Sequence, residues 1–276
     1  MFKLFKNDNV YLSLLGYILM YVLYYCVLCS VLRAFNISVA VITAISMLLT
    51  INSIRIREKK RDIDFETALG IKPVRLNKES LLMLVLLGVG LNFAISGILN
   101  IMPSGMSESY TQSYKVIMDG SLYGTIIVMA IITPILEEIF FRGIFQRKLG
   151  ERLGTAAGLV AAAVIFGLMH FNIIWSTYSA ILGFFLGCIY LYYGSVLPGA
   201  IVHCTFNLVS CVPLIVSGYE KVYKYTFGSK IYVVITMVIG FFIIYRIVDK
   251  TWIKAYFNRE FYGFAPKGEV EDDENI

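Results

Sequence analysis

The feature that most constrains the fold of this chain is a series of long apolar segments separated by short polar ones. A helix that crosses a bilayer needs about 20 predominantly apolar residues. Windows of this kind cover residues 10–34, 37–54, 80–102, 121–144, 154–172, 174–193, 195–216 and 231–248, with an extension of the fourth to about Lys148 as the alternative. The pattern predicts an all-α fold, a polytopic membrane helix bundle of about eight transmembrane helices, with seven as the alternative count.

The composition agrees with a membrane protein. Hydrophobic residues make up 58% of the chain and charged residues 16%, whereas soluble domains are about half apolar and about a quarter charged. The net charge of +5 does not indicate a nucleic-acid partner, since the basic residues follow the loops between the apolar segments. The five cysteines lie within apolar segments, which predicts packing residues rather than a disulfide framework.

The distribution of basic residues predicts the orientation in the membrane. The first apolar segment follows Lys3 and Lys6 and lacks a small-residue cleavage site, so we expect an uncleaved transmembrane helix. With the N-terminus inside, the inner loops and tails carry 18 Lys and Arg residues and the outer ones carry five. Because cytoplasmic loops are enriched in these residues, both termini are predicted to be cytoplasmic.

Residues 1–266 are expected to form a single integral membrane domain. Within it, the segment from Arg55 to Ser80 mixes charged and apolar residues, which indicates a short amphipathic stretch on the cytoplasmic surface. Residues 267–276 form an acidic tail, which is expected to be disordered and solvated. Neither segment contains residues that point to chemistry.

Two adjacent glutamates in the fourth apolar segment are the first candidates for chemistry. Charged side chains at membrane depth are costly, rare and commonly functional, and Glu137 and Glu138 both lie well inside this segment. Glu138 and Arg142 are four residues apart and can pair on one helix face, whereas Glu137 points about 100° away. Glu137 is therefore expected to be the free carboxylate, suited to general acid or base catalysis, with a structural ion cluster as the alternative.

Both histidines of the chain also lie in apolar segments. His170 follows Phe166 by four residues in the fifth segment, and His203 precedes Asn207 by four residues in the seventh. An imidazole and an amide on one face can stabilise an oxyanion together, although membrane helices also use such residues for structural contacts. Each pattern alone fits a structural role, but their joint occurrence predicts an active site between helices 4, 5 and 7.

These motifs resemble those of the CPBP family of intramembrane proteases. This family comprises CAAX proteases and bacteriocin-processing enzymes, and is also called the Abi or Rce1-like family. Its motifs E-E-x-x-x-R, F-x-x-x-H and H-x-x-x-N occur in this order on successive helices. All three are complete here, as Glu137-Glu138…Arg142, Phe166…His170 and His203…Asn207.

The resemblance implies a role for each matching residue. Glu137 and His170 would bind and activate the water that attacks the scissile carbonyl, and His203 and Asn207 would form the oxyanion site. The supporting residues would be Glu138, Arg142 and Phe166.

The use of a metal stays open. Glu137, His170 and His203 would supply three zinc ligands and leave a fourth position open, and the family has been described both as metalloproteases and as glutamate-dependent proteases. Zinc proteases usually place two ligands in an H-E-x-x-H pair, which this chain lacks. We therefore expect that no cofactor is required, with zinc as the alternative.

The predicted function is that of an intramembrane endopeptidase of the bacterial plasma membrane. Its partners would be the lipid bilayer and a membrane-associated protein or peptide substrate. A non-enzymatic bacteriocin-immunity or membrane adaptor protein of the same family is the alternative. A proton-coupled transporter would also use intramembrane acids and histidines, but the polar residues here do not follow the two repeated halves of such a protein.

Overall fold

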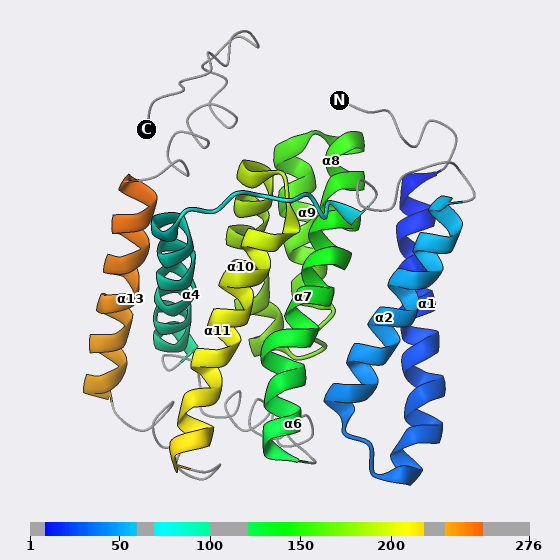
Figure 1. The fold of residues 1–276 in the computed structure, drawn as a ribbon, viewed down its shortest axis with the longest axis horizontal. Helices are drawn as coiled ribbons and strands as arrows, with labels where there is room; N and C mark the ends of the chain where they lie inside the picture. The colour runs from blue at the N-terminus through cyan, green and yellow to red at the C-terminus, as the bar shows by residue number, and fades with distance from the viewer. Residues whose placement is uncertain (1–8, 60–68, 100–120, 218–229, 251–276) are drawn as a thin grey trace, which may run out of the picture.

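The computed structural model describes residues 9–59, 69–99, 121–217 and 230–250. All regular structure in these ranges is helical (Figure 1), which confirms the predicted all-α class. The fourth of the predicted helices spans residues 122–153; it comprises α6 to α8 and is called the fourth helix below, as distinct from α4. The other long helices are α1 (Val10–Leu32), α2 (Val39–Lys59), α4 (Lys78–Leu99), α9 (Thr155–Leu168), α10 (Ile173–Tyr193), α11 (Val196–Ser217) and α13 (Lys230–Lys250).

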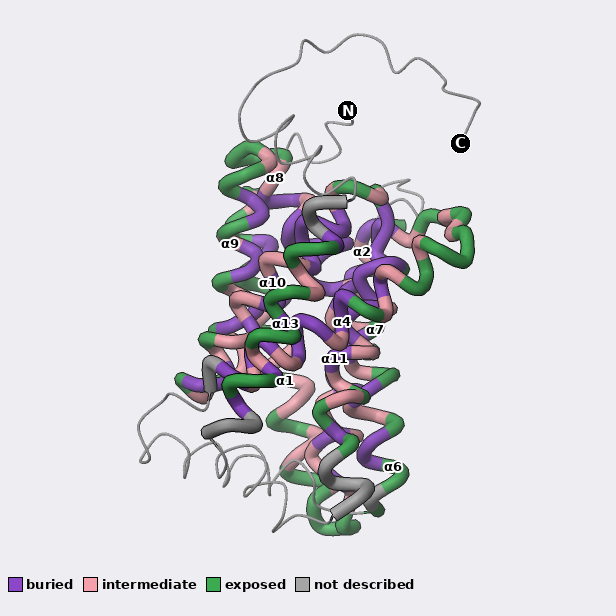
Figure 2. Tube along the Cα trace, turned by 90° about the vertical axis from the view of Figure 1, so that its left-hand side faces the viewer, coloured by how far each residue is buried: buried purple, intermediate pink, exposed green. Residues whose placement is uncertain are grey.

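The helices form three groups placed side by side. The α1–α2 hairpin lies at one side and the α4–α13 pair at the other, with the fourth helix, α9, α10 and α11 between them (Figure 1). One buried apolar cluster joins α4, α10, α11 and α13, and a second joins α1, α2, α9 and the fourth helix. Buried residues accordingly run through the middle of the bundle, whereas exposed residues cover the end of α8 and much of α6 (Figure 2).

Five helices are long and apolar enough to cross a membrane by length and composition. They cover Val10–Phe35, Val39–Lys59, Lys78–Gly97, Tyr123–Leu153 and Ile173–Tyr193. The described parts of the three other predicted helices are shorter apolar helices, at Thr155–Leu168, Val196–Val212 and Val233–Ile247. The chain is therefore an integral membrane helix bundle. The prediction for the fifth helix was too long, because α9 ends at Leu168 rather than near residue 172.

The fourth helix is a continuous rod made of α-helical and π-helical parts. Its parts are α6 (Leu122–Ile127), η2 (Val128–Ile132), α7 (Thr133–Glu138), η3 (Ile139–Gln146) and α8 (Arg147–Leu153). The two π-helical parts, η2 and η3, flank the part that ends in the glutamate pair. π-helical turns are rare and frequently mark functional sites, because their i→i+5 bonding widens the helix and changes where its carbonyl groups point.

The fourth helix is longer than the predicted window 121–144. It ends at Leu153 because Gly154 has φ +91°, a backbone conformation that glycine adopts without a steric cost. Glu137 precedes Gly154 by 17 residues, and His170 follows it by 16. Since the fourth helix and α9 run in opposite directions from this turn, the two side chains lie at a similar depth.

An extended segment, residues 71–77, crosses one end of the bundle between α2 and α4 (Figure 1). Just before it, the carbonyl of Gly70 accepts from the backbone N–H of Val196, at 3.1 Å, and thereby satisfies an N-terminal donor of α11. The hydroxyl of Ser195 donates to the carbonyl of Lys72, at 2.7 Å. The predicted amphipathic stretch is described only at its two ends, and residues 60–68 and 267–276 lie outside the described residues.

Candidate active site

The predicted ion pair between Glu138 and Arg142 is present. Arg142 Nη1 lies 2.8 Å from Glu138 Oε1, and both side chains are fully buried. The other end of the guanidinium donates to the carbonyl of Gly183 on α10, at 3.2 Å. Its Cζ also lies 4.5 Å from the centroid of the Phe166 ring, a cation–π contact that holds Arg142 from α9. Phe166 therefore supports the ion pair directly.

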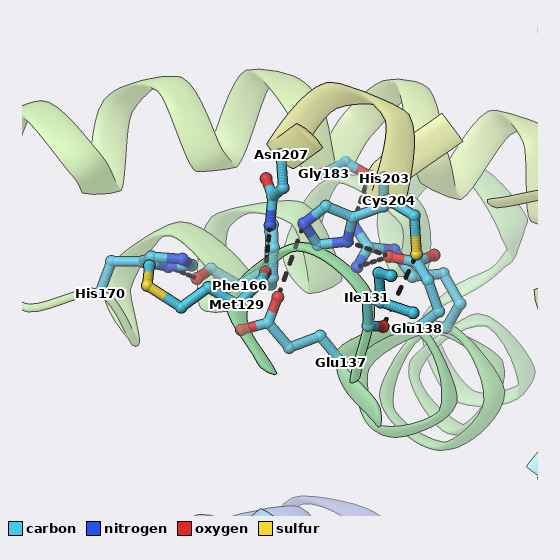
Figure 3. Close-up of polar contacts among 11 residues, drawn as sticks. Met129, Ile131, Glu137, Glu138, Phe166, His170, Gly183, His203, Cys204 and Asn207 are labelled. Atoms are coloured by element: carbon cyan, nitrogen blue, oxygen red, sulfur yellow. Dashed lines mark hydrogen bonds and ion pairs between the residues drawn. The ribbon is translucent and has the colours of Figure 1, made fainter. Parts of the chain in front are cut away.

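His203 on α11 connects the two glutamates (Figure 3). Its Nδ1 lies 3.1 Å from Glu138 Oε1, and its Nε2 lies 3.6 Å from Glu137 Oε2. Since a carboxylate that already accepts from Arg142 acts as an acceptor, Nδ1 must carry the proton in the first contact. The imidazole is thus fixed between two acids. The expectation that Glu137 is a free carboxylate was wrong, because its partner comes from another helix.

Asn207 lies one helical turn beyond His203 on the same face of α11. Its Nδ2 donates to the carbonyl of Met129, at 3.0 Å. Between them, Cys204 Sγ donates to the carbonyl of Ile131, at 3.6 Å. Both acceptors belong to the π-helical part η2, so the wide turn presents its carbonyls to α11. No side-chain motif predicts these two acceptors, because they act through the backbone.

His170 lies in the turn after α9 rather than inside a helix. Phe171, the next residue, has φ +51°, a left-handed conformation that ends the helix. His170 Nδ1 lies 2.9 Å from the carbonyl of Phe166, which requires a proton on Nδ1 and leaves Nε2 as the acceptor. The ring packs edge-on against Phe166, at 5.1 Å between centroids. Figure 3 shows the Glu137 carboxylate between the imidazoles of His170 and His203.

The residues named as potential zinc ligands do not form a metal site. Within the described ranges, no group of three or more His, Cys, Asp and Glu side chains is arranged to hold a metal ion. Glu137 and His203 approach each other, but their contact is an ion pair. His170 Nδ1 is engaged by the Phe166 carbonyl, which leaves Nε2 as the ring nitrogen that could bind a metal. In the part of the chain that the structure describes, the three potential ligands therefore do not converge on one metal position.

A second buried charge pair lies outside the site and was not predicted from the sequence. Lys148 Nζ on α8 lies 3.1 Å from Glu58 Oε1 at the end of α2, and both side chains are buried. Tyr17 on α1 donates its hydroxyl to the same oxygen, at 3.0 Å. Glu58 falls in the predicted amphipathic stretch, and Lys148 was counted with the basic residues of the inner loops, because both follow the end of an apolar window. Their burial depends on the packing of three helices.

Comparison with protein families places part of this chain in a known family. Residues 119–209 match the family model of type II CAAX prenyl endopeptidase Rce1-like proteins. The matched range holds the glutamate pair with Arg142, the Phe166–His170 turn and the His203–Asn207 face. No curated protein and no solved structure matches the chain. The part of the chain that holds the candidate site is therefore similar to the Rce1-like family of type II CAAX prenyl endopeptidases.

Proposed function

We propose that this chain is an intramembrane endopeptidase that hydrolyses a peptide bond of a membrane-associated protein or peptide, with Glu137 as the general base. One observation carries the proposal: of the two adjacent acids, one is neutralised by Arg142 at 2.8 Å, and the other faces an imidazole at 3.6 Å. The second carboxylate also keeps 14% of its side chain accessible. It is the acid that a water and a substrate are able to reach.

The charges of the buried groups support the proton positions that this reaction needs. Glu137, Glu138 and Arg142 together carry one net negative charge when all are ionised. An isolated buried charge is costly, and a protonated His203 brings the four groups to neutrality. In that state both ring nitrogens of His203 carry protons; Nδ1 donates to Glu138, and Nε2 faces Glu137 at 3.6 Å. Glu137 is then ionised and able to accept a proton, and His203 is able to donate one.

The reaction follows from these positions. A water between Glu137 and His170 gives a proton to the Glu137 carboxylate as its oxygen attacks the scissile carbonyl carbon. The oxyanion receives hydrogen bonds from His203 Nε2 and from the second N–H of Asn207 Nδ2, since the first is donated to Met129. The C–N bond then breaks, and Glu137 returns its proton to the leaving amine. No metal takes part, and activity that persists after chelation is the check on this point.

The test is a conservative change at Glu137. Glu137→Gln keeps the shape of the side chain and removes the base, so hydrolysis should fall by about 10²- to 10⁴-fold. The purified protein is incubated with a farnesylated peptide ending in a CAAX sequence and, separately, with membranes whose released peptides are identified by mass spectrometry. Glu151→Gln is the matched control, because Glu151 is an exposed acid on the same continuous helix.

Two results would contradict the proposal. Wild-type rates in the Glu137→Gln variant would exclude Glu137 as the base. Absence of cleavage by the folded wild-type protein in both assays would favour the alternative of a non-enzymatic immunity or adaptor protein.

A further inference from the structure

The Glu138 carboxylate is packed against a glycine of α11. Its Oε2 is buried and has no hydrogen-bond partner among the described residues, while Oε1 accepts from both Arg142 and His203. A Cβ atom built at Gly199 would lie 2.8 Å from Glu138 Oε2 and 3.6 Å from its Cδ. The backbone of α11 therefore lies against the carboxylate at the point where any larger residue would place a side chain.

The carboxylate has little room to withdraw from α11. Arg142 holds Oε1 at 2.8 Å and is itself held by the carbonyl of Gly183 on α10, at 3.2 Å. A Cβ atom at Gly183 would lie 3.2 Å from Arg142 Nη2, so α10 lies close to the guanidinium as well. The ion pair is thus enclosed between α10 and α11. An added methyl group at Gly199 must move either α11 or the carboxylate.

Either movement acts on His203, because Gly199 and His203 are one helical turn apart on α11. A shift of α11 carries His203 with it, and a shift of the carboxylate removes the acceptor of His203 Nδ1, now at 3.1 Å. The position of Nε2 relative to Glu137, at 3.6 Å, changes in both cases. Gly199 touches neither Glu137 nor a substrate, so its effect passes through Glu138 and His203.

We propose that Gly199 is a positioning residue: the absence of a side chain there lets α11 approach Glu138 closely enough to hold His203 in the orientation that the reaction requires. The catalytic consequence rests on the proposed function. The expected displacement of His203 does not rest on the proposed function, because the contact between His203 and Glu138 exists without substrate.

The test compares Gly199→Ala with Gly187→Ala. A Cβ atom at Gly187 would lie 2.2 Å from Leu159 Cδ1 and 2.6 Å from Gln146 Oε1, so this control is at least as crowded but meets side chains outside the ion pair. Gly199→Ala should lower kcat on the order of 10²-fold, as expected for a small misplacement of a catalytic group, and leave KM unchanged. Gly187→Ala should lower thermal stability without a comparable loss of kcat.

The second readout is the ¹⁵N NMR spectrum of labelled histidine in the purified protein. The chain has only two histidines, so a His170→Gln variant assigns both. In Gly199→Ala, the signal of the protonated Nδ1 of His203 should shift, whereas in Gly187→Ala it should stay at its wild-type position. This measurement needs no substrate. A wild-type protein without peptidase activity would therefore overturn the proposed function and leave the inference on Gly199 intact.

A third variant applies if Gly199→Ala folds poorly. Glu138→Asp shortens the side chain by one methylene and makes room for the new methyl group, so Gly199→Ala should lower thermal stability less in the Glu138→Asp protein than in the wild-type protein. An equal loss of stability from Gly199→Ala in both proteins would show that the methyl group does not meet Glu138, and would overturn the inference. A wild-type kcat and a wild-type His203 signal in Gly199→Ala would also overturn it, as would an equal loss of kcat in Gly187→Ala.

Discussion

At the scale of single residues, His203 gives the two adjacent glutamates different roles. Glu138 shares its Oε1 between His203 and Arg142, so its negative charge is compensated inside the protein. Glu137 faces the far nitrogen of the same ring, at the longer distance of 3.6 Å. The two glutamates therefore differ in their partners rather than in their residue type, and this difference underlies the proposal that Glu137 is the one that acts on a substrate.

Asn207 carries a prediction at this scale. Removal of one oxyanion donor typically costs about 10²- to 10³-fold in kcat, so Asn207→Ala should lower kcat by this factor with little change in KM. Steady-state kinetics of the purified variant check the prediction. Thr205→Val is the control, because Thr205 donates to the carbonyl of Ile201 within its own helix. A wild-type kcat in Asn207→Ala would remove this residue from the proposed oxyanion site.

At the scale of elements, the fourth helix receives contacts from both sides along its length. Near its middle, α11 contributes His203 and Asn207, and at its end the α1–α2 hairpin is attached through Tyr17 and Glu58 to Lys148. The aromatic rings of Phe140, Phe141 and Phe145 pack between these two regions. These three phenylalanines belong to the π-helical part η3. The contacts of the α1–α2 hairpin and the candidate site therefore lie on one continuous helix.

The buried pair of Glu58 and Lys148 should behave as a coupled unit. Lys148→Met leaves the Glu58 carboxylate buried without its cation, which should cost about 3–5 kcal/mol in the free energy of unfolding. The double variant Glu58→Gln with Lys148→Met should lose less than the sum of the single variants. Denaturation in detergent micelles measures all four proteins, and Arg152→Met at an exposed site on α8 is the control. Additive losses would show that the two charges do not interact.

At the scale of the whole molecule, the ends of the bundle differ in charge. α1 begins and α13 ends at the same end of the bundle (Figure 1), as expected for an even number of membrane crossings. Most of the described basic residues also lie at this end, on the last turns of α2, on the segment before α4, on α8 and near the end of α13. This distribution supports the predicted orientation, in which this end faces the cytoplasm.

Reporter fusions test the orientation. Green fluorescent protein fused after Ile276 should be fluorescent, and alkaline phosphatase fused at the same place should be inactive, because both termini are predicted to be cytoplasmic. The same reporters fused after Asn36, at the opposite end of α1, should give the reverse result. An active alkaline phosphatase after Ile276 would contradict the predicted orientation.

The sequence by itself determined the features that depend on neighbouring residues. Runs of apolar residues predicted the helices, because each helix pairs its own backbone groups wherever it packs. Spacings of four residues predicted the pairing of Glu138 with Arg142 and the shared face of His203 and Asn207, since both follow from helix geometry. The complete motifs also indicated the family, which the match of residues 119–209 confirms.

Only the tertiary structure decided which groups from different helices meet. It placed His203 between the two glutamates, moved His170 into a turn, engaged Asn207 with a backbone carbonyl and buried Lys148 with Glu58. These contacts depend on the π-helical turns, on the break at Gly154 and on the close approach of α11 at Gly199. The physical reason is that a local pattern sets the face of a helix, whereas the packing of backbones against one another sets what that face touches.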